Sequence, residues 1–429
     1  MAESIFLESR SQCSGTVVLP GSKSIANRAL LMSALCSEPV RLHNLLNSED
    51  TEHMLNALTA LGVQCEKVDK TMVVTGLSGR WKPAETSLHL GNAGTAMRPL
   101  IAALASTLSA NQQVELTGDS RMQERPVQHL VEALQAQGAE VSYKKASGFP
   151  PVLIKPGLNA GDFSIDGSVS SQFISALLMA LPLLKGNSTL TLVGEVVSKP
   201  YIELTLKMLA DFGIVIERVS ESRFHIKGSQ SYVSPGNYHV EGDASGASYW
   251  MAAALLGGGP VTIEGVGAAS IQGDKAFTEV IQAMGGNVDM GQHQMTVTGF
   301  GHIKGIEQDF NAIPDAAMTV APLALFADKP TIIRNVANWR VKETDRLSAM
   351  ATELRKLGAE VEEGVDYIKI HPVQQWQSAE IDTYNDHRMA MCFSLVAFSP
   401  VGITINDPDC CRKTYPTYFQ EFSRICQSY

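Results

Sequence analysis

The sequence lacks a long apolar run and a recognisable export signal. Its longest nearly unbroken apolar stretch lies around residues 176–184 and is interrupted by Pro182, whereas a membrane helix needs about 20 consecutive apolar residues. The first dozen residues, MAESIFLESRSQ, contain no basic segment followed by an apolar one, as a secretory signal would. We therefore expect no membrane span and a cytoplasmic protein.

Cysteine is scarce and irregularly placed. The chain has seven cysteines, an odd number without the paired spacing of a metal site, which is typical of reduced thiols in a cytoplasmic protein. No dinucleotide-binding fingerprint follows a predicted strand. We therefore expect neither a metal nor a cofactor.

Basic residues are also fewer than acidic ones. The 34 Lys and Arg residues against 44 Asp and Glu give a net charge of -10, which argues against a nucleic-acid or membrane-surface partner, since both favour basic surfaces. An anionic ligand would need the available cations to be concentrated in one place.

What the sequence does contain is a repeat of about 73 residues. Each copy has a turn marked by Gly, Pro or Asn, then small polar residues, then a strongly apolar helix-like run. The gaps between successive copies are 70, 76, 75, 72 and 71 residues, too regular for chance. The six copies begin at Gly21, Gly91, Gly167, Gly242, Pro314 and Asn385.

A second pattern runs out of phase with the first. Helix-like segments end in a glycine, the usual left-handed stop of a helix, and then enter a short alternating strand. These glycines are Gly62, Gly138, Gly213, Gly285 and Gly358. A sixth copy would fall beyond residue 429, so we expect the amino-terminal stretch to supply the strand that completes the last unit.

Together the patterns predict an α/β protein of six βαβαββ units, three in each of two domains. We place one domain at residues 1–20 and 242–429, and the other at 21–241. The helices of the first pattern are apolar on nearly every face, so they should be buried at the centre of each domain. Their polar starts expose free N–H groups that favour anions, and we expect an anion site in the cleft between the domains.

Several helix starts in the first half of the chain carry residues suited to phosphate or carboxylate. Lys23 and Arg28 lie in GSKSIANR, which lacks the spacing of a Walker loop. GNAGTAMRP lets the backbone approach a ligand closely, and the serines of GSVSSQ exceed what helix capping needs. Each has an ordinary alternative: a glycine-rich turn with solvated charges, or a cap. For Arg121 and Arg125, that alternative is a charged loop.

The second half is more informative. In NWRVKETDR, Arg340, Lys342, Glu343, Asp345 and Arg346 lie close together. A solvated helix face is the default interpretation, but Trp339 and the apolar strand before it indicate an anchored segment. NDHRMAM places His387 and Arg388 at the start of an apolar helix, and Asp315 holds the same position one repeat earlier, where it could also be a cap. Arginine forks suit phosphates and carboxylates, and carboxylates beside them can act as acids or bases.

These motifs resemble those of the 3-phosphoshikimate 1-carboxyvinyltransferase (EPSP synthase) family. The resemblance runs end to end, from LPGSKSIANRALL to CRKTYP, and GNAGTAMRP and KETDR are its most specific parts. It implies an enolpyruvyl transferase-like fold, an inside-out α/β barrel of three βαβαββ repeats per domain. It also implies an enzyme that transfers the enolpyruvyl group of phosphoenolpyruvate (PEP) to the 5-hydroxyl of shikimate 3-phosphate, without a metal. The sequence does not reveal the oligomeric state, for which we expect a monomer.

The resemblance also assigns residues. Asp315 would be the base and Glu343 the proton donor, with Lys23 as a further candidate for these roles. The positions matching the shikimate 3-phosphate site are Lys23, Ser24, Arg28, Ser170, Ser171, Gln172, Ser198, Tyr201, Asp315, Asn338 and Lys342. Those matching the PEP site are Lys23, Asn92, Gly94, Arg125, Gln172, Arg346, His387, Arg388 and Lys413. Gly94 and Pro99 match the form of the loop that goes with inhibition by glyphosate.

Two alternatives stay open at this stage. The related enzyme that acts on UDP-N-acetylglucosamine shares the fold and chemistry, but it typically carries a reactive cysteine in a loop of one domain, and RMQERP contains none. Six repeats could also form a clamp around nucleic acid, which would favour basic residues spread over all repeats. The sequence assigns no role beyond packing to Cys410 and Cys411.

Overall fold

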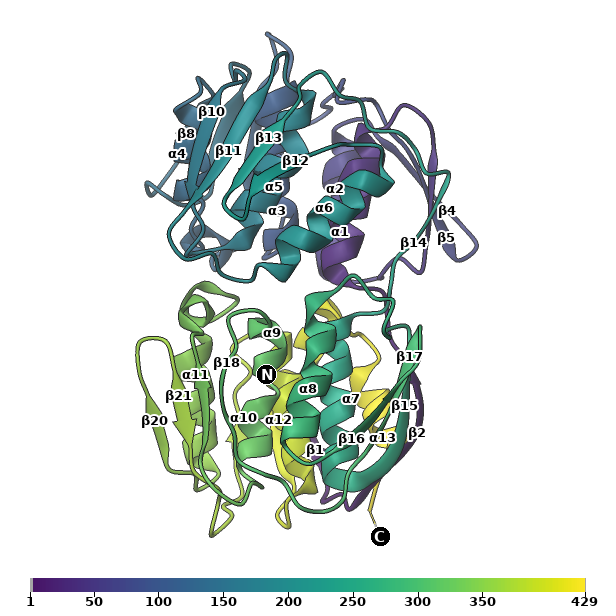
Figure 1. Ribbon diagram of the computed structural model, residues 1–429, viewed down its shortest axis with the longest axis vertical. Coiled ribbons are helices and arrows are strands. Elements are labelled where there is room, and N and C mark those ends of the chain that lie inside the picture. The colour runs from purple at the N-terminus through teal and green to yellow at the C-terminus, as the bar shows by residue number, and fades with distance from the viewer. Residues whose placement is uncertain (1–2, 429) are drawn as a thin grey trace. The chain divides into compact units, whose positions relative to one another are not determined.

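The computed structural model describes residues 3–428 and consists of two compact units. Unit 2 is Gly21–Val240, and unit 1 contains the segments before and after it (Figure 1). The chain crosses between them at Pro20–Gly21 and at Val240–Glu241, so Glu241 belongs to unit 1. The boundary predicted from the sequence, after residue 241, therefore lies one residue later than the boundary in the structure.

Unit 2 contains three four-stranded sheets, and the strands are arranged in the same order in each of them. In each sheet, the first two strands are parallel and the other two pairings are antiparallel. The sheets therefore repeat one βαβαββ pattern. In sheet order, they are β14 (Asn237–His239), β3 (Val40–His43), β5 (Thr71–Thr75), β4 (Gln64–Val68); β6 (Ser87–His89), β7 (Val114–Thr117), β9 (Val152–Lys155), β8 (Glu140–Tyr143); and β10 (Asp162–Asp166), β11 (Ser188–Val193), β13 (Arg223–Ile226), β12 (Glu217–Ser220).

The helices of unit 2 fall into two kinds. Three are buried on nearly every face, as predicted for the first pattern, and pack against one another: α1 (Lys23–Leu35), α3 (Gly94–Thr107) and α5 (Ser171–Ala180). Three bury one face only: α2 (Glu49–Ala60), α4 (Gln128–Gln135) and α6 (Pro200–Asp211). Two short 3-10 helices, η1 (Met122–Glu124) and η2 (Leu181–Leu183), complete the unit.

The described part of unit 1 also contains three sheets. Two keep the strand order of unit 2. The first is β2 (Gln12–Val18), β15 (Gly258–Glu264), β17 (Gln294–Thr298), β16 (Asn287–Met290), with β24 (Cys426–Gln427) on the other side of β2. The second is β18 (Glu307–Asp309), β19 (Thr331–Arg334), β21 (Ile368–Ile370), β20 (Val361–Glu363). The third is β1 (Ser4–Leu7), β23 (Ile403–Asn406) and β22 (Glu380–Ile381).

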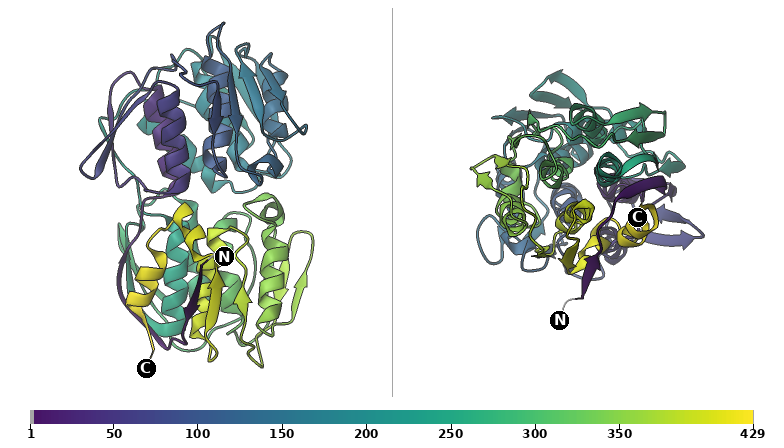
Figure 2. Two further views of the ribbon diagram at one scale, coloured as in Figure 1. Left: turned by 180° about the vertical axis from the view of Figure 1, so that it is seen from behind. Right: turned by 90° about the horizontal axis from the view of Figure 1, so that it is seen from below.

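The amino-terminal stretch contributes to two of these sheets. β1 pairs antiparallel with β23 and so completes the last unit, as predicted (Figure 2). β2 instead lies parallel to β15 in the first sheet of unit 1. The two strands of one short segment therefore belong to different repeats.

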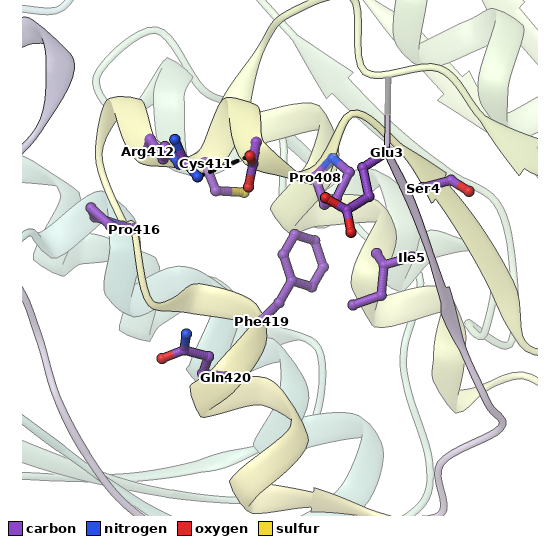
Figure 3. Close-up of a pocket in the computed structure, with 10 residues that line it drawn as sticks. Glu3, Ser4, Ile5, Pro408, Cys411, Arg412, Pro416, Phe419 and Gln420 are labelled. Carbon is purple, nitrogen blue, oxygen red and sulfur yellow. Dashed lines mark ion pairs between the residues drawn. The ribbon is translucent and has the colours of Figure 1, made fainter. Parts of the chain in front are cut away.

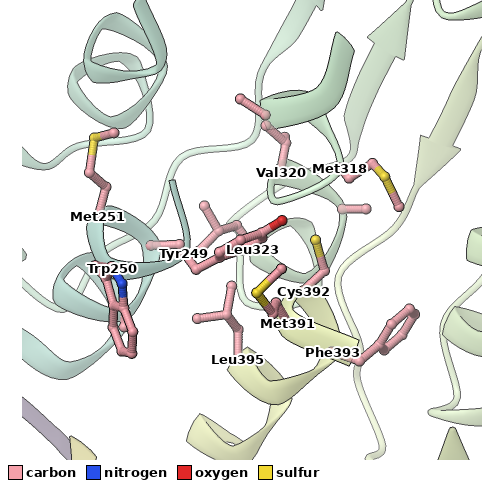
Figure 4. Packing of buried hydrophobic residues seen from close by; sticks show 14 of the residues in the cluster. Tyr249, Trp250, Met251, Met318, Val320, Leu323, Met391, Cys392, Phe393 and Leu395 are labelled. Atoms are coloured by element: carbon pink, nitrogen blue, oxygen red, sulfur yellow. The ribbon is translucent and has the colours of Figure 1, made fainter. Parts of the chain in front are cut away.

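The buried helices of unit 1 are α7 (Ala244–Gly257), α9 (Pro314–Ala317), α10 (Val320–Ala324) and α12 (His387–Ser394). Pro322 has no N–H with which to bond the carbonyl of Met318, consistent with the interruption between α9 and α10 near that residue. Tyr249, Leu323 and Met391 from three of these helices meet in the core (Figure 4). The remaining helices are α8 (Phe277–Ala283), α11 (Arg346–Lys356), α13 (Tyr418–Ile425), η3 (Gly273–Ala276), η4 (Ala337–Val341), η5 (Leu395–Phe398) and η6 (Pro408–Lys413).

The helix-ending glycines confirm the second pattern. All five adopt positive φ, between 76° and 105°, a region in which residues with a Cβ are strained. The fold is α/β with repeated sheets on central helices, as predicted. The strands of residues 3–428 form six separate sheets and no single closed barrel. Among these residues, no helix is long and apolar enough to cross a membrane.

Candidate active site

A buried arginine organises the candidate site of unit 1. The side chain of Arg346 is 1% exposed and donates to three carboxylates: Asp386 from Nε at 2.7 Å, Asp315 from Nη1 at 2.9 Å, and Glu343 from Nη2 at 2.9 Å. A further Nη2 contact reaches Asp386 at 3.4 Å. Four of the five N–H groups of this guanidinium are thus directed at carboxylates, which raise its pKa above the ordinary value although burial alone would lower it.

Asp315 connects Arg346 to two more cations. Its Oδ1 lies 3.5 Å from Lys342 Nζ, and its Oδ2 lies 3.2 Å from Arg388 Nη2. Burial alone would raise the pKa of this carboxyl, but Lys342, Arg388 and Arg346 together hold it well below its usual range. Asp315 is therefore ionised at neutral pH.

The segment carrying Lys342 and Glu343 is anchored, as Trp339 indicated. Trp339 is fully buried on η4, and its Nε1 donates to the carbonyl of Pro314 at 2.7 Å, beside Asp315. Asp345 caps α11 by accepting from the N–H of Ser348. The tryptophan thus fixes the loop against α9, and the cap starts the helix that bears Arg346.

The start of α12 brings in the third carboxylate. Asp386 is fully buried and caps the helix by accepting from the N–H of Arg388 at 2.9 Å. His387 is also fully buried, with Nδ1 3.5 Å from Asp386 Oδ1. Arg388 Nη1 donates to the hydroxyl of Tyr249 at 3.2 Å, so α7 helps to orient this arginine.

Lys413 lies at the end of η6, which packs on α12. The lysine is 6% exposed, and the neighbouring Cys411 places its Sγ 3.9 Å from the carbonyl of His387. Burial raises the pKa of the Cys411 thiol well above its usual value. Cys410 and Cys411 are buried thiols that pack η6 against the core.

In unit 2, the start of α1 carries a buried ion pair. Lys23 Nζ lies 3.4 Å from Asp50 Oδ2, and both side chains are largely covered. Asp50 belongs to the first turn of α2, whose cap is Ser48. The pair holds a cation at a helix start, with Ser24 half-buried beside it.

Arg125 binds the turn that opens α3. Its Nη1 donates to the side chain of Asn92 at 2.8 Å and to the carbonyl of Asn92 at 2.9 Å. A methyl group added at Gly94 would lie 2.1 Å from Arg98 Nη1 and 2.9 Å from Arg125 Nη2. Arg98 Nη1 in turn donates to Gln172 Oε1 at 2.9 Å. A side chain at position 94 would therefore displace at least one of the two guanidinium groups that converge there.

Arg28 forms hydrogen bonds with other residues of unit 2. It is 4% exposed and donates to Ser175 on α5 and Thr205 on α6, at 3.2 Å and 2.9 Å. Burial lowers its pKa to about 10, while the nearby Tyr201 raises it. Ser198 precedes α6 with φ at 56°, and Ser170 caps α5 by accepting from the N–H of Gln172.

The structure groups the candidate residues by unit. In unit 1, Asp315, Lys342, Glu343, Arg346 and Arg388 are in direct contact, with His387 against Asp386. Asn338 is 6% exposed on η4. In unit 2, the residues form smaller sets: Lys23 with Asp50, Arg125 with Asn92, and Gln172 with Arg98 and Ser170.

Several residues of the candidate site were not predicted from the sequence. Asp386 has a signal that could have identified it, because an Asp before an apolar helix is a cap. Asp50 lies among other acids at the start of α2, and Arg98 and Tyr249 lie inside apolar helices; nothing local distinguishes their roles. Arg121 pairs with the exposed Glu124 at 3.1 Å, as expected if it belongs to an ordinary charged loop.

A separate cavity of about 260 Å³ lies under η6 (Figure 3). It is lined by β1, η6 and α13, including Glu3, Arg412 and Phe419. It contains none of the predicted site residues. Among residues 3–428, no group of His, Cys, Asp or Glu has an arrangement that could hold a metal ion.

Comparison with solved structures places the fold among enolpyruvyl transferases. An EPSP synthase from Acinetobacter baumannii superimposes with a TM-score of 0.80 at 24% identity, over 100% of this chain and 99% of that one. The enolpyruvyl transferase NikO from Streptomyces tendae gives 0.80 at 20% identity, over 99% and 98%. At these identities, the likeness defines the fold class alone.

Sequence comparison is more specific. The family described as EPSP synthase (3-phosphoshikimate 1-carboxyvinyltransferase) matches residues 7–422. Relatives named 3-phosphoshikimate 1-carboxyvinyltransferase are 67% identical in Idiomarina loihiensis, over 100% of both chains, and 54% identical in Actinobacillus pleuropneumoniae, over 99% of both. The chain therefore belongs to the EPSP synthase family.

Proposed function

We propose that this chain transfers the enolpyruvyl group of PEP to the 5-hydroxyl of shikimate 3-phosphate and releases phosphate, a step of aromatic amino acid biosynthesis. The observation that carries the proposal is the attachment of Asp315 and Glu343 to one buried guanidinium, that of Arg346. Two carboxylates in fixed relation to each other and to several cations suit a reaction that moves two protons beside anionic substrates.

The first proton comes from the 5-hydroxyl of shikimate 3-phosphate. Asp315 accepts it as the hydroxyl oxygen attacks C2 of PEP. Its low pKa keeps the carboxylate ionised before the reaction. An anion bound at Arg388 and Lys342 would offset their charge, which would raise the basicity of Asp315 when substrates are present.

The second proton goes to the methylene carbon of PEP. Glu343 donates it after being protonated on the oxygen that Arg346 does not contact, giving a tetrahedral intermediate with a methyl group, and Lys23 is the alternative donor. In the elimination step, a methyl proton returns to the protein as the C2–O bond to phosphate breaks. Atoms balance without a covalent enzyme intermediate.

We further propose that residues of both domains contribute to substrate binding. Cationic side chains at helix starts supply the charge, and their fork geometry suits phosphate and carboxylate. Arg346 has one N–H beyond its four contacts with carboxylates, so PEP would take that donor or displace Asp315. Shikimate 3-phosphate would bind Lys23, Ser24, Arg28, Ser170, Ser171, Gln172, Ser198, Tyr201, Asp315, Asn338 and Lys342. PEP would bind Lys23, Asn92, Gly94, Arg125, Gln172, Arg346, His387, Arg388 and Lys413.

Glyphosate is the proposed inhibitor, binding at the PEP site. The support is Gly94, whose missing side chain lets the guanidinium groups of Arg98 and Arg125 converge at the start of α3. We also propose a monomeric cytoplasmic protein. All seven cysteines are free thiols, consistent with a reducing compartment.

The experiment is to follow phosphate release with shikimate 3-phosphate and PEP, without added metal. Release that requires both substrates supports the proposal. Asp315→Asn and Glu343→Gln should each lower kcat by about 100-fold or more, the usual contribution of a positioned acid or base. Glu307→Gln is the matched control, because Glu307 pairs with Arg334 on the exposed surface of the same unit.

Two results would overturn the proposal. One is no release with shikimate 3-phosphate and PEP from folded protein. The other is release only when UDP-N-acetylglucosamine replaces shikimate 3-phosphate, which would assign the related enolpyruvyl transfer instead. Uninhibited turnover at high glyphosate concentration would refute the inhibitor assignment alone.

A further inference from the structure

Two consecutive residues with left-handed backbone precede α12. Tyr384 and Asn385 have φ of 54° and 52°, a region that residues with a Cβ seldom occupy. Such a conformation persists only where the surroundings hold it. The next residues are Asp386, His387 and Arg388, so the strained turn fixes the backbone position from which these three side chains extend.

A buried carboxylate on α11 holds this turn. Glu353 is fully buried and accepts a hydrogen bond from the hydroxyl of Tyr384 at 2.7 Å and from the N–H of Asp382 at 3.1 Å. Lys356 Nζ lies 2.7 Å from Glu353 and 2.9 Å from the side chain of Asp382. One carboxylate therefore contacts both the backbone and a side chain of the turn, with its charge offset by a lysine.

The position of Glu353 on α11 relates this contact to the candidate site. Arg346 and Glu353 are seven residues apart, close to two helical turns, so they lie on one face. Arg346 binds Asp386 at the end of the turn, and Glu353 binds Asp382 and Tyr384 at its beginning. The single helix α11 therefore contacts segment 382–386 at both of its ends.

We propose that Glu353 is a positioning residue, which fixes the left-handed turn so that His387 and Arg388 are oriented for the anion they bind and Asp386 for its contact with Arg346. The kinetic part of this inference rests on the proposed function, in which His387 and Arg388 bind PEP. Glu353 itself touches no substrate. It acts through the hydroxyl of Tyr384 and the backbone of Asp382.

Hydrogen exchange of the intact protein without substrates tests the structural step. Glu353→Ala should speed amide exchange in segment 382–388 by about tenfold, the order expected for losing two hydrogen bonds to a buried acceptor. Glu353→Gln should restore slow exchange, because its carbonyl accepts from Asp382 and its amide donates to Tyr384. Glu362→Gln is the matched control, since Glu362 accepts from the Tyr367 hydroxyl at 2.5 Å on an exposed hairpin.

Steady-state kinetics test the functional step. Glu353→Ala should raise KM for PEP about tenfold, since displacing a positioned group by about 1 Å can cost about 100-fold. KM for shikimate 3-phosphate should change far less, and Glu353→Gln should recover most of the loss. A merely structural role would lower the amount of active protein and leave both KM values unchanged.

The outcomes of the two experiments are distinct. Unchanged exchange in Glu353→Ala, or equal rises in both KM values, would overturn the inference. If Glu353→Ala does not fold, Tyr384→Phe removes a single hydrogen bond and carries the same test. If the wild-type protein shows no turnover of shikimate 3-phosphate and PEP, the proposed function fails, while the exchange experiment still decides whether Glu353 holds the turn.

Discussion

Removing the guanidinium of Arg346 should destabilise unit 1 in a way that depends on pH. Arg346→Met keeps much of the side-chain length and leaves Asp386 and Glu343, which are 0% and 7% exposed, without their shared cation. Breaking a buried ion pair by removing one partner costs about 3–5 kcal/mol. Because four hydrogen bonds are lost, we expect the upper part of that range.

The sign of the pH dependence follows from Asp315. Arg346 is one of three cations that hold the pKa of Asp315 well below its usual range although burial alone would raise it, so removing Arg346 raises that pKa. The stability that the low pKa contributes in the wild-type protein is present above the unfolded pKa and is lost as pH falls through the folded-state pKa. The free energy of unfolding of Arg346→Met should therefore fall further below wild type at pH 7 than at pH 3.

The assay is urea unfolding at several pH values, followed by tryptophan fluorescence. Trp339 is fully buried beside Pro314 and reports directly on this region. Arg334→Met is the control, because Arg334 pairs with Glu307 on the surface and should cost far less at every pH. A stability difference between Arg346→Met and wild type that does not change with pH would refute the reasoning.

Three further predictions concern single positions. Gly94→Ala should raise KM for PEP and weaken glyphosate inhibition, because the new methyl meets Arg98 Nη1 at 2.1 Å; unchanged KM in steady-state kinetics would contradict this. The pKa of Asp315 lies below its unfolded value, so its stabilisation is present above about pH 4 and lost as pH falls further. Acid titration of Asp315→Asn should show a smaller loss of stability there, and a loss as steep as wild type would contradict it. Gly358→Ala should cost about 1–2 kcal/mol at φ 93°, measured by urea unfolding against Gly246→Ala, whose methyl meets only ordinary contacts of 3.5 Å or more; equal stability of the two variants would rule it out.

Much of the fold could be predicted because its signals are local. The helix-ending glycines all take positive φ, and the apolar runs after Gly21, Gly91 and Gly167 form the most buried helices of unit 2. A helix stop depends on the residue at that position, and burial depends on the pattern along one helix. Both can be read from neighbouring residues.

Two features of the fold were not accessible in this way. β1 and β2 belong to one short segment, but β1 pairs with β23 and β2 with β15. The period of the sequence shows that a strand is missing from the last repeat, and it does not show which strand fills the place. Strand pairing is a choice among distant partners of similar composition.

For the candidate site, the sequence by itself determined the repeated helix starts and the residue types gathered there: arginine, lysine and carboxylate in short, specific motifs. Only the tertiary structure decided which of them meet. Arg346 reaches Asp386 and Asp315 across 40 and 31 residues, and Arg388 reaches Asp315 across 73. These partners, and with them the low pKa of Asp315, follow from the packing of α9, α11 and α12, because an ion pair depends on distance in space, which the spacing along the chain does not fix.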